Sequence, residues 1–336
     1  RQMCIRDSTY IANQSAADGL AAGVSATDTF AYTVSDGTAT STVNLVITVT
    51  GVGPQAVADT ASVNENVLLN ANNASSTGLL ANDDDNANFD SESLAVTNVS
   101  SNSTGNSGSA TQGVLGTYGT LTVAADGTYT YTPNTAAAEA LAEGAQQTDV
   151  FTYTVKDDDD KNSSTATLTI TVTGKDDDPV ASADTGTATE DGPQVSVDAA
   201  SGVLANDTDV DAGETLVVSA VGGNGAAVGQ DVTGSLGTLN LDADGSYTYI
   251  ADQAGADAIT AGQTATDTFN YTLSDGEGTT STVNLVITVT GKGPLGVADT
   301  ASVAENATVA KNNASTDGVL SNDDDNASFD QESLAV

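Results

Sequence analysis

One segment of this chain occurs three times, and no other feature constrains the fold as strongly. The copies occupy residues 27–51, 148–174 and 266–291. In the first copy Phe30, Tyr32 and Val34 alternate with small or polar residues, and Asp36-Gly37 forms a turn signal before a second alternating stretch. Side chains two residues apart share one face of a strand, so each copy is expected to form a β-hairpin with one buried face.

The rest of the chain follows the same period, which indicates a repeat protein. The tripeptide Ala-Asp-Thr begins at Ala58, Ala183 and Ala298, and residues 40–51 return unchanged at residues 280–291. We expect the C-terminal part of one repeat, two complete repeats and the N-terminal part of another, at residues 9–54, 55–179, 180–294 and 295–336. The chain is then expected to be a fragment of a longer array.

The first eight residues do not fit this pattern. They contain both Arg residues, the only Met and the only Cys, Cys4. The match to the repeat begins only at Tyr10, which corresponds to Tyr249. We interpret residues 1–8 as a foreign peptide, and a single cysteine allows no disulfide within the chain.

Composition and turn signals predict an all-β fold. Thr and Val favour strands, while Gly, Asn and Asp favour turns. Within a repeat the turn signals separate about seven or eight short strands, the number typical of a β-sandwich. Apolar residues alternate with Thr and Ser, so two sheets are expected to face one core. A short helix is expected at residues 136–145, and Tyr129 and Tyr131 lie on one strand face.

The charge of the chain restricts its partners. The sequence has 46 acidic and 7 basic residues, for a net charge of -39. Such a chain repels nucleic acid and anionic membrane surfaces, and it attracts multivalent cations. Acidity also keeps secreted or halophilic proteins soluble, but that role does not explain why Asp residues cluster in particular turns. No apolar run is long enough for a transmembrane helix, and no direct membrane insertion is expected.

Several motifs in fixed order resemble a known family. They are Ala183-Asp184-Thr185, Val203-Leu204-Ala205-Asn206-Asp207, Ala243-Asp244-Gly245, Thr266-Asp267-Thr268-Phe269 and Ile287-Thr288-Val289-Thr290-Gly291. Together they resemble the VCBS-type, cadherin-like repeat of bacterial surface and RTX-type adhesins. The resemblance covers nearly the whole chain after residue 8. It implies tandem immunoglobulin/cadherin-like sandwiches, secreted or at the cell surface, that calcium rigidifies and that serve in adhesion or biofilm attachment.

An Asp-rich turn in each repeat is the sharpest candidate for a metal site. Carboxylates at alternate positions, with Gly allowing a tight turn, can converge on one hard cation, and Ca²⁺ accepts six to eight oxygens in irregular loops. The candidate Ca²⁺ ligands are Asp207, Asp209, Asp211 and Glu214, with equivalents Asp83, Asp85, Asp90 and Glu92, and Asp323, Asp325, Asp330 and Glu332. The alternative is that Asn and Asp simply favour the turn.

The linker between the complete repeats is a second candidate. Asp176, Asp177 and Asp178 precede Pro179, an arrangement that resembles the calcium-binding junctions of cadherin-like repeats. By the same resemblance Glu190, in the first segment of its repeat, is a further candidate ligand. The linkers before Pro54 and Pro294 contain no acid, so stiff and flexible joints are expected to alternate. A solvated acidic linker is the alternative.

Catalysis is not expected. The chain has no His, so neither a Ser-His-Asp triad nor a His-ligated zinc site is possible. We expect an extracellular array that mediates or spaces adhesion through an unidentified protein or glycan ligand and through neighbouring repeats. Two alternatives remain: a carbohydrate-binding module that uses the Tyr pairs, and an accessory region of a secreted polysaccharide-associated enzyme or toxin. Residues 157–160, at a hairpin tip, are interpreted as a solvated charge run.

Overall fold

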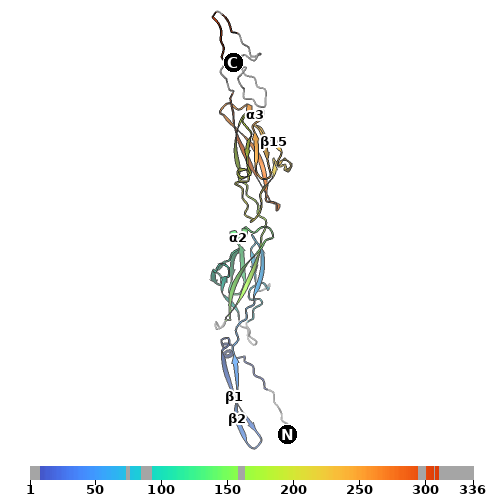
Figure 1. The fold of residues 1–336 in the computed structure, drawn as a ribbon. Coiled ribbons are helices and arrows are strands. Elements are labelled where there is room, and N and C mark those ends of the chain that lie inside the picture. The colour runs from blue at the N-terminus through green and yellow to red at the C-terminus, as the bar shows by residue number, and fades with distance from the viewer. Residues whose placement is uncertain are drawn as a thin grey trace. The chain divides into compact units, whose positions relative to one another are not determined.

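The computed structural model describes residues 8–72, 76–84, 93–157, 163–293, 300–305 and 307–309. The chain divides into two compact units, Arg1–Lys175 and Asp176–Val336. Each unit contains one complete sandwich of two sheets, coloured mainly green in the first unit and yellow to orange in the second (Figure 1). The predicted all-β class and tandem sandwich architecture are confirmed.

The sandwich of the first unit has a five-stranded and a four-stranded sheet, in the orders β3-β11-β10-β5-β6 and β4-β9-β8-β7. The strands of the larger sheet are β3 (Asp59–Asn64), β5 (Ala95–Ser101), β6 (Ser107–Ser109), β10 (Gln146–Lys156) and β11 (Ser163–Thr173). The strands of the smaller sheet are β4 (Leu69–Ala71), β7 (Gly113–Leu115), β8 (Gly119–Val123) and β9 (Tyr129–Pro133).

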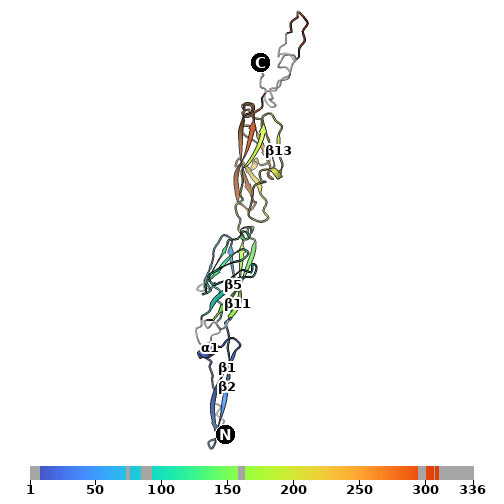
Figure 2. The same ribbon diagram turned by 90° about the vertical axis from the view of Figure 1, so that its left-hand side faces the viewer.

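The second unit repeats this plan with two four-stranded sheets, in the orders β12-β19-β18-β14 and β13-β17-β16-β15. The strands of the first sheet are β12 (Asp184–Thr189), β14 (Val217–Val221), β18 (Thr264–Ser274) and β19 (Thr280–Thr290). The strands of the other sheet are β13 (Val195–Val197), β15 (Asp231–Thr233), β16 (Thr238–Leu241) and β17 (Tyr247–Ile250). Figure 2 labels β13, an edge strand of the sheet β13-β17-β16-β15.

Helices are few and short. They are α1 (Ser15–Asp18), α2 (Ala136–Glu139), η2 (Ala199–Ser201), η3 (Gly225–Ala227) and α3 (Ala254–Asp257). The helix expected over residues 136–145 is therefore shorter than predicted: it ends at Glu139, because the backbone leaves the helical conformation at Ala140, and β10 begins at Gln146. None of the helices in the described ranges has the length and hydrophobicity of a membrane span.

The recurring hairpin forms the centre of one sheet in each complete sandwich. Strands β18 and β19 pair antiparallel from Thr264↔Thr290 to Ser274↔Thr280, and β10 pairs with β11 in the same way. On the other side of each hairpin the first strand of the repeat pairs in parallel with the last one. In the second unit this pairing runs from Asp184↔Leu285 to Thr189↔Thr290.

The inward rows of the two sheets form one core in each unit. In the second unit Tyr271, Leu285 and Ile287 from one sheet pack with Leu239 and Tyr249 from the other, and all five side chains are buried. The first unit has the corresponding core. Tyr129, Tyr131, Tyr247 and Tyr249 are all buried in these cores. Aromatic platforms for a sugar are therefore not formed by these pairs.

The first copy of the hairpin differs from the other two in exposure. It forms a two-stranded sheet of β1 (Ser25–Ser35) and β2 (Thr40–Thr50). Phe30 and Tyr32 are about half exposed, at 47% and 50%, whereas the matching Phe269 and Tyr271 are 7% and 1% exposed. The same alternating pattern thus has a buried face in the complete repeats and an exposed face in this hairpin.

Candidate metal centre

A short backbone pairing brings the entry segment of the second unit beside its Asp-rich turn. Val180 and Thr208 form an isolated antiparallel bridge, with N–H···O distances of 2.8 and 3.1 Å. The same bridge joins Gln55 and Asp84 in the first unit. In the second unit this places residues 176–178 next to residues 209–211, so two predicted sites converge on one region.

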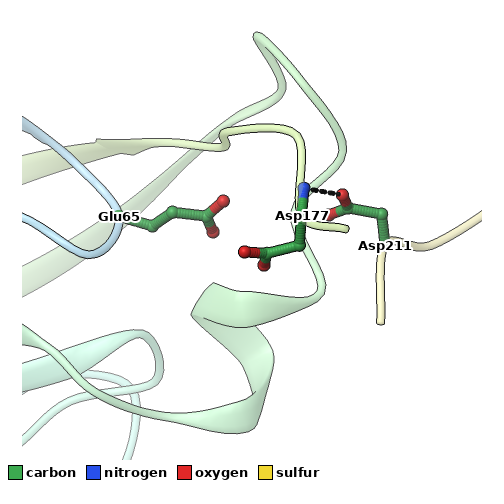
Figure 3. A group of neighbouring side chains, drawn as sticks. All are labelled: Glu65, Asp177 and Asp211. Carbon is green, nitrogen blue, oxygen red and sulfur yellow. Dashed lines mark hydrogen bonds between the residues drawn. The ribbon is translucent and has the colours of Figure 1, made fainter. Parts of the chain in front are cut away.

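The Asp-rich turn folds back on itself through its own carboxylates. The N–H of Asp211 donates to Asp209 Oδ1 at 2.9 Å, and Gly213 has a φ of 94°, which favours glycine. The N–H of Asp177 then donates to Asp211 Oδ2 at 2.9 Å, as Figure 3 shows. One oxygen of Asp211 is therefore fixed by the entry segment, and the other remains available to a ligand.

The tip of the β18–β19 hairpin completes the cluster. Asp275 accepts hydrogen bonds from the N–H groups of Glu277 and Gly278 and from the Thr279 hydroxyl. The same Thr279 hydroxyl lies 3.3 Å from the carbonyl oxygen of Asp177. The hairpin tip is thus held against the entry segment, and the buried Asp275 carboxylate lies beside Asp209 and Glu214 of the turn.

Two groups of three carboxylates result. Asp176, Asp211 and Glu214 form one, and Asp209, Glu214 and Asp275 form the other; within each, the candidate ligand atoms lie within 4.8 Å of one another. All these residues belong to the second unit. Three oxygens at such separations can bind one hard cation, with backbone oxygens or water completing the coordination.

Several oxygens of this cluster are buried without a donor. Within the described part of the chain, no hydrogen-bond donor reaches Asp177 Oδ2, Asp209 Oδ2, Asp211 Oδ1 or either carboxylate oxygen of Glu214. Asp211 as a whole is only 5% exposed. Burying an unpaired carboxylate is costly, and neighbouring carboxylates add repulsion. The donor set and its orphaned oxygens fit a hard divalent cation.

The pKa values of the cluster shift in the direction that this crowding requires. Burial, followed by repulsion from Asp209, Asp211, Asp176 and Asp275, raises the pKa of Glu214 to about 7. Burial and the neighbouring Asp211 also raise the pKa of Asp177. Both shifts reflect an environment that disfavours a negative charge unless a cation offsets it.

Asp207 and Asp83 take part in hydrogen bonds with backbone N–H groups and a tyrosine hydroxyl of their own repeat. Asp207 accepts the Ser182 N–H at 2.7 Å, and Tyr271 donates its hydroxyl to Asp184 at 2.8 Å and lies 3.3 Å from Asp207. Asp83 accepts the Val57 N–H at 2.7 Å in the same manner. Neither residue belongs to a carboxylate group in the described part of the chain.

The remaining candidates fall into two sets. Asp178 is exposed. Glu190 directly follows β12, is buried, and accepts a hydrogen bond from the Lys292 N–H at 2.6 Å. In the first unit Glu65 is also buried and accepts the Lys175 N–H at 2.5 Å. The candidates that lie outside the described residues are Asp85, Asp90, Glu92, Asp323, Asp325, Asp330 and Glu332.

Sequence reasoning missed the hairpin tips. Asp275 is read as a turn residue because Ser-Asp-Gly is a common turn sequence, yet its carboxylate belongs to a group. Asp157, interpreted as part of a solvated charge run, is buried, and its Oδ1 has no donor among the described residues. The available signal was position: Asp36, Asp157 and Asp275 occupy the same place in the three hairpin copies.

A second kind of buried carboxylate has enough donors and needs no cation. Asp267 Oδ2 accepts the N–H groups of Leu236 and Gly237 and the Tyr249 hydroxyl, each at 3.0 Å. Asp149 has the same role toward residues 117–119 and Tyr131 in the first unit. These residues tie a loop to the central hairpin, and they show that burial alone does not mark a metal ligand.

Among solved structures, the chain is similar to mouse protocadherin-24 EC1-3 (TM-score 0.39, 13% identity, covering 79% of this chain and 80% of that one). It is also similar to mouse cadherin-23 EC22-24 (0.38, 13%, 80% and 74%) and to Drosophila N-cadherin EC1-4 (0.26, 11%, 82% and 60%). No curated protein sequence matches the chain.

The family assignment comes from the sequence itself. A family model described as the bacterial cadherin-like domain matches residues 52–174 and again residues 176–291, which together exceed half of the chain. The two matches coincide with the two complete sandwiches. The chain therefore belongs to the bacterial cadherin-like domain family and contains two tandem copies of that domain.

Proposed function

We propose that these repeats are calcium-binding structural modules of a large bacterial surface or secreted protein, which spaces or mediates attachment of the cell. The main observation behind this proposal is that Asp209, Asp211 and Glu214 have buried carboxylate oxygens without hydrogen-bond donors among the described residues. A fold keeps such a group only if a ligand offsets its charge. Calcium suits the group because it takes six to eight oxygens without strict geometry, whereas Mg²⁺ demands a near-octahedral set.

In the second unit the ion would be held by three segments that are distant in sequence. Asp176 and Asp177 come from the entry segment, residues 209–214 from the turn, and Asp275 from the hairpin tip. A bound cation would join these segments at one end of the sandwich. Its effect is therefore structural: it fixes the entry segment relative to the repeat that follows it.

The adhesive role and the RTX-type assignment rest on less direct support. The tandem sandwiches and the family of bacterial cadherin-like domains favour an extracellular array over an enzyme. Four further described residues remain proposed ligands: Asp178, Glu190 and Asp207 in the second unit, and Asp83 in the first. The candidates outside the described residues also remain proposed ligands. The ligand of such an array would be a protein or glycan of another cell or a matrix.

Thermal unfolding with calcium and with chelator tests this function. We expect the melting temperature to rise with calcium in the micromolar to millimolar range and to fall when EGTA removes it, because binding to the native state alone stabilises it. A melting temperature that is the same in calcium and in EGTA, together with no heat of binding in calorimetry, would refute calcium binding. Attachment of beads that carry the chain to cells or matrix would test adhesion separately.

A further inference from the structure

We propose that the outer edge of β2, in the first hairpin, accepts residues 300–304 of a second copy of the chain as a parallel strand. Copies of the chain would then associate head to tail. In the described part of the chain, each of the two segments lacks the strand partner that its sequence equivalent has in a complete repeat. The association uses no residue of the proposed calcium site and does not rest on calcium binding.

The first segment, β2, is equivalent to β11 and β19 of the complete repeats. Residues 40–51 have the same sequence as residues 280–291, which include the whole of β19. In a complete repeat this strand pairs antiparallel with the strand before it, and on its other edge it pairs in parallel with the first strand of the repeat. Among the described residues, β2 forms a sheet with β1 alone. Its outer edge can therefore accept a further strand.

The second segment, residues 300–304, has the sequence of a first strand but not its structure. Residues 298–303 have the same sequence as residues 58–63, which supply most of β3. Residues 300–304 nevertheless form no strand. Val303 is 56% exposed, whereas Val63, at the same position of β3, is 9% exposed and belongs to the core. The sequence that forms the parallel edge strand of a complete repeat thus lies without a partner strand in the described structure.

The two segments expose apolar side chains that pack together when both belong to one repeat. Leu45 of β2 is 46% exposed, whereas its equivalents Leu168 and Leu285 are fully buried. In the first unit Val172 pairs with Val63, and both side chains lie in the core. The equivalent pair is Val49 and Val303. Joining the segments of two copies would remove this apolar surface from water, which favours the association.

The complete repeats also define the register of the association. Strand β3 pairs with β11 from Leu168↔Asp59 to Thr173↔Asn64, and β12 pairs with β19 in the same register. Transferred by sequence, this register places Thr48 of one copy beside Ser302 of the other. A shift by one residue would turn Val303 away from the apolar face, so a single register is expected.

The distribution of charge favours contact at these segments. Each copy has a net charge of -39, so copies repel one another. Strands β1 and β2 contain one acidic residue, Asp28, and residues 300–304 contain none. Little repulsion therefore acts across the contact itself, and salt screens the rest. Because the two surfaces differ, the contact is heterologous and adds copies in a series rather than closing a symmetric dimer.

Disulfide trapping between two single-cysteine chains tests the register. Both full-length chains contain Cys4→Ser, and one has Thr48→Cys while the other has Ser302→Cys, at two exposed positions. Directly paired residues of neighbouring strands are close enough for a disulfide. The mixed dimer is therefore expected in large excess over dimers of either chain with itself. The matched control is Thr42→Cys, an exposed position of β2 about 20 Å from Thr48, which should give little mixed dimer with Ser302→Cys.

Sedimentation velocity at increasing protein concentration measures the association itself. The wild-type chain is expected to form species larger than a monomer, and sodium chloride should increase them. Val303→Asp places a charge at a position that is buried in β3, and it should abolish these species. Ser302→Asp adds the same charge where the equivalent Ser62 is exposed, so it should retain them. Val303 and Ser302 are both exposed, so neither substitution disturbs a core.

Three results would each overturn the association. They are a monomer at every concentration, mixed dimers as abundant with Thr42→Cys as with Thr48→Cys, and oligomers that persist in Val303→Asp. Repeating the measurements in calcium and in EGTA keeps the association separate from the proposed function. A chain that associates in EGTA without binding calcium would contradict calcium binding alone, and a chain that binds calcium but stays monomeric would contradict the association alone.

Discussion

At the scale of single residues, donors distinguish two kinds of buried carboxylate. Asp267 and Asp149 accept backbone N–H groups and a tyrosine hydroxyl, whereas Glu214 and Asp211 have buried oxygens that no described donor reaches. The first kind stabilises the fold without any ligand, and the second is the kind for which we propose a bound cation. Sequence contains a signal for the first kind, because an Asp follows a Tyr by the same spacing at Tyr10/Asp28, Tyr131/Asp149 and Tyr249/Asp267.

Replacing Asp267 by Asn is expected to destabilise the second unit by about 1–3 kcal/mol, the cost of leaving buried donors unsatisfied. Asn keeps one acceptor oxygen, but its NH₂ group would face a backbone N–H group that donates to a carboxylate oxygen in the wild-type protein. Urea unfolding measures the loss. Asp231→Asn, at an exposed acid on β15, is the matched control and should change stability little. Equal stability of Asp267→Asn and the wild type would contradict the assigned role.

The same residue predicts a pH dependence. Burial alone would raise the pKa of Asp267, but hydrogen bonds from Leu236, Ser235 and Tyr249 outweigh it and lower the pKa below the usual 3.8. A carboxyl group with a lowered folded-state pKa stabilises the fold above its unfolded-state pKa, and this contribution is lost as the pH falls through the folded-state pKa. The stability difference between wild type and Asp267→Asn should therefore shrink below about pH 4. A stability difference that stays constant down to pH 2.5 would argue against a lowered pKa of Asp267.

At the scale of elements, local periodicity predicted the hairpins and could not predict their neighbours. The alternation of Phe, Tyr and Val places one face of β18 and β19 in the core, as observed. The parallel pairing of β12 with β19 joins segments about a hundred residues apart in sequence, and alternation contains no information about such a partner. For the same reason the sequence could not show that the tip residue Asp275 meets Asp209 and Glu214.

The exposed hairpin β1–β2 gives a prediction at this scale. An isolated fragment of residues 9–54 is expected to be largely unfolded, because a two-stranded hairpin is marginal in water. A fragment of residues 176–293 is expected to fold, since its core consists of its own residues. Far-UV circular dichroism and amide exchange compare the two. Cooperative unfolding of the shorter fragment would show that the hairpin is stable without a second sheet packed against it.

At the scale of the whole molecule, negative charge avoids the long strands. The strands β10, β11, β18 and β19 contain only two acidic residues, Asp149 and Asp267, and both are buried. The other 44 of the 46 acidic residues lie elsewhere in the chain. The outer faces of these four strands thus contain many hydroxyl groups and no acidic group, and the repulsion that accompanies a net charge of -39 acts mainly elsewhere in the chain.

This distribution predicts different responses of the whole chain to sodium and to calcium. Sodium chloride is expected to raise the melting temperature modestly, because it screens exposed charges. Calcium chloride at the same ionic strength is expected to raise it more, because buried carboxylates need a bound ion rather than screening. Differential scanning calorimetry at matched ionic strength makes the comparison. Equal shifts with the two salts would indicate screening alone.

The parallel pairing of the first and last strands has a mechanical consequence. In the second unit the chain enters at the Asp184 end of β12 and leaves at the Thr290 end of β19, and these ends lie at opposite ends of the paired segment. Tension applied through the two ends would load the backbone hydrogen bonds between the strands in shear, all together, and could not open them one after another. Strands β3 and β11 have the same geometry in the first unit. Each repeat is thus built to resist tension applied along the chain.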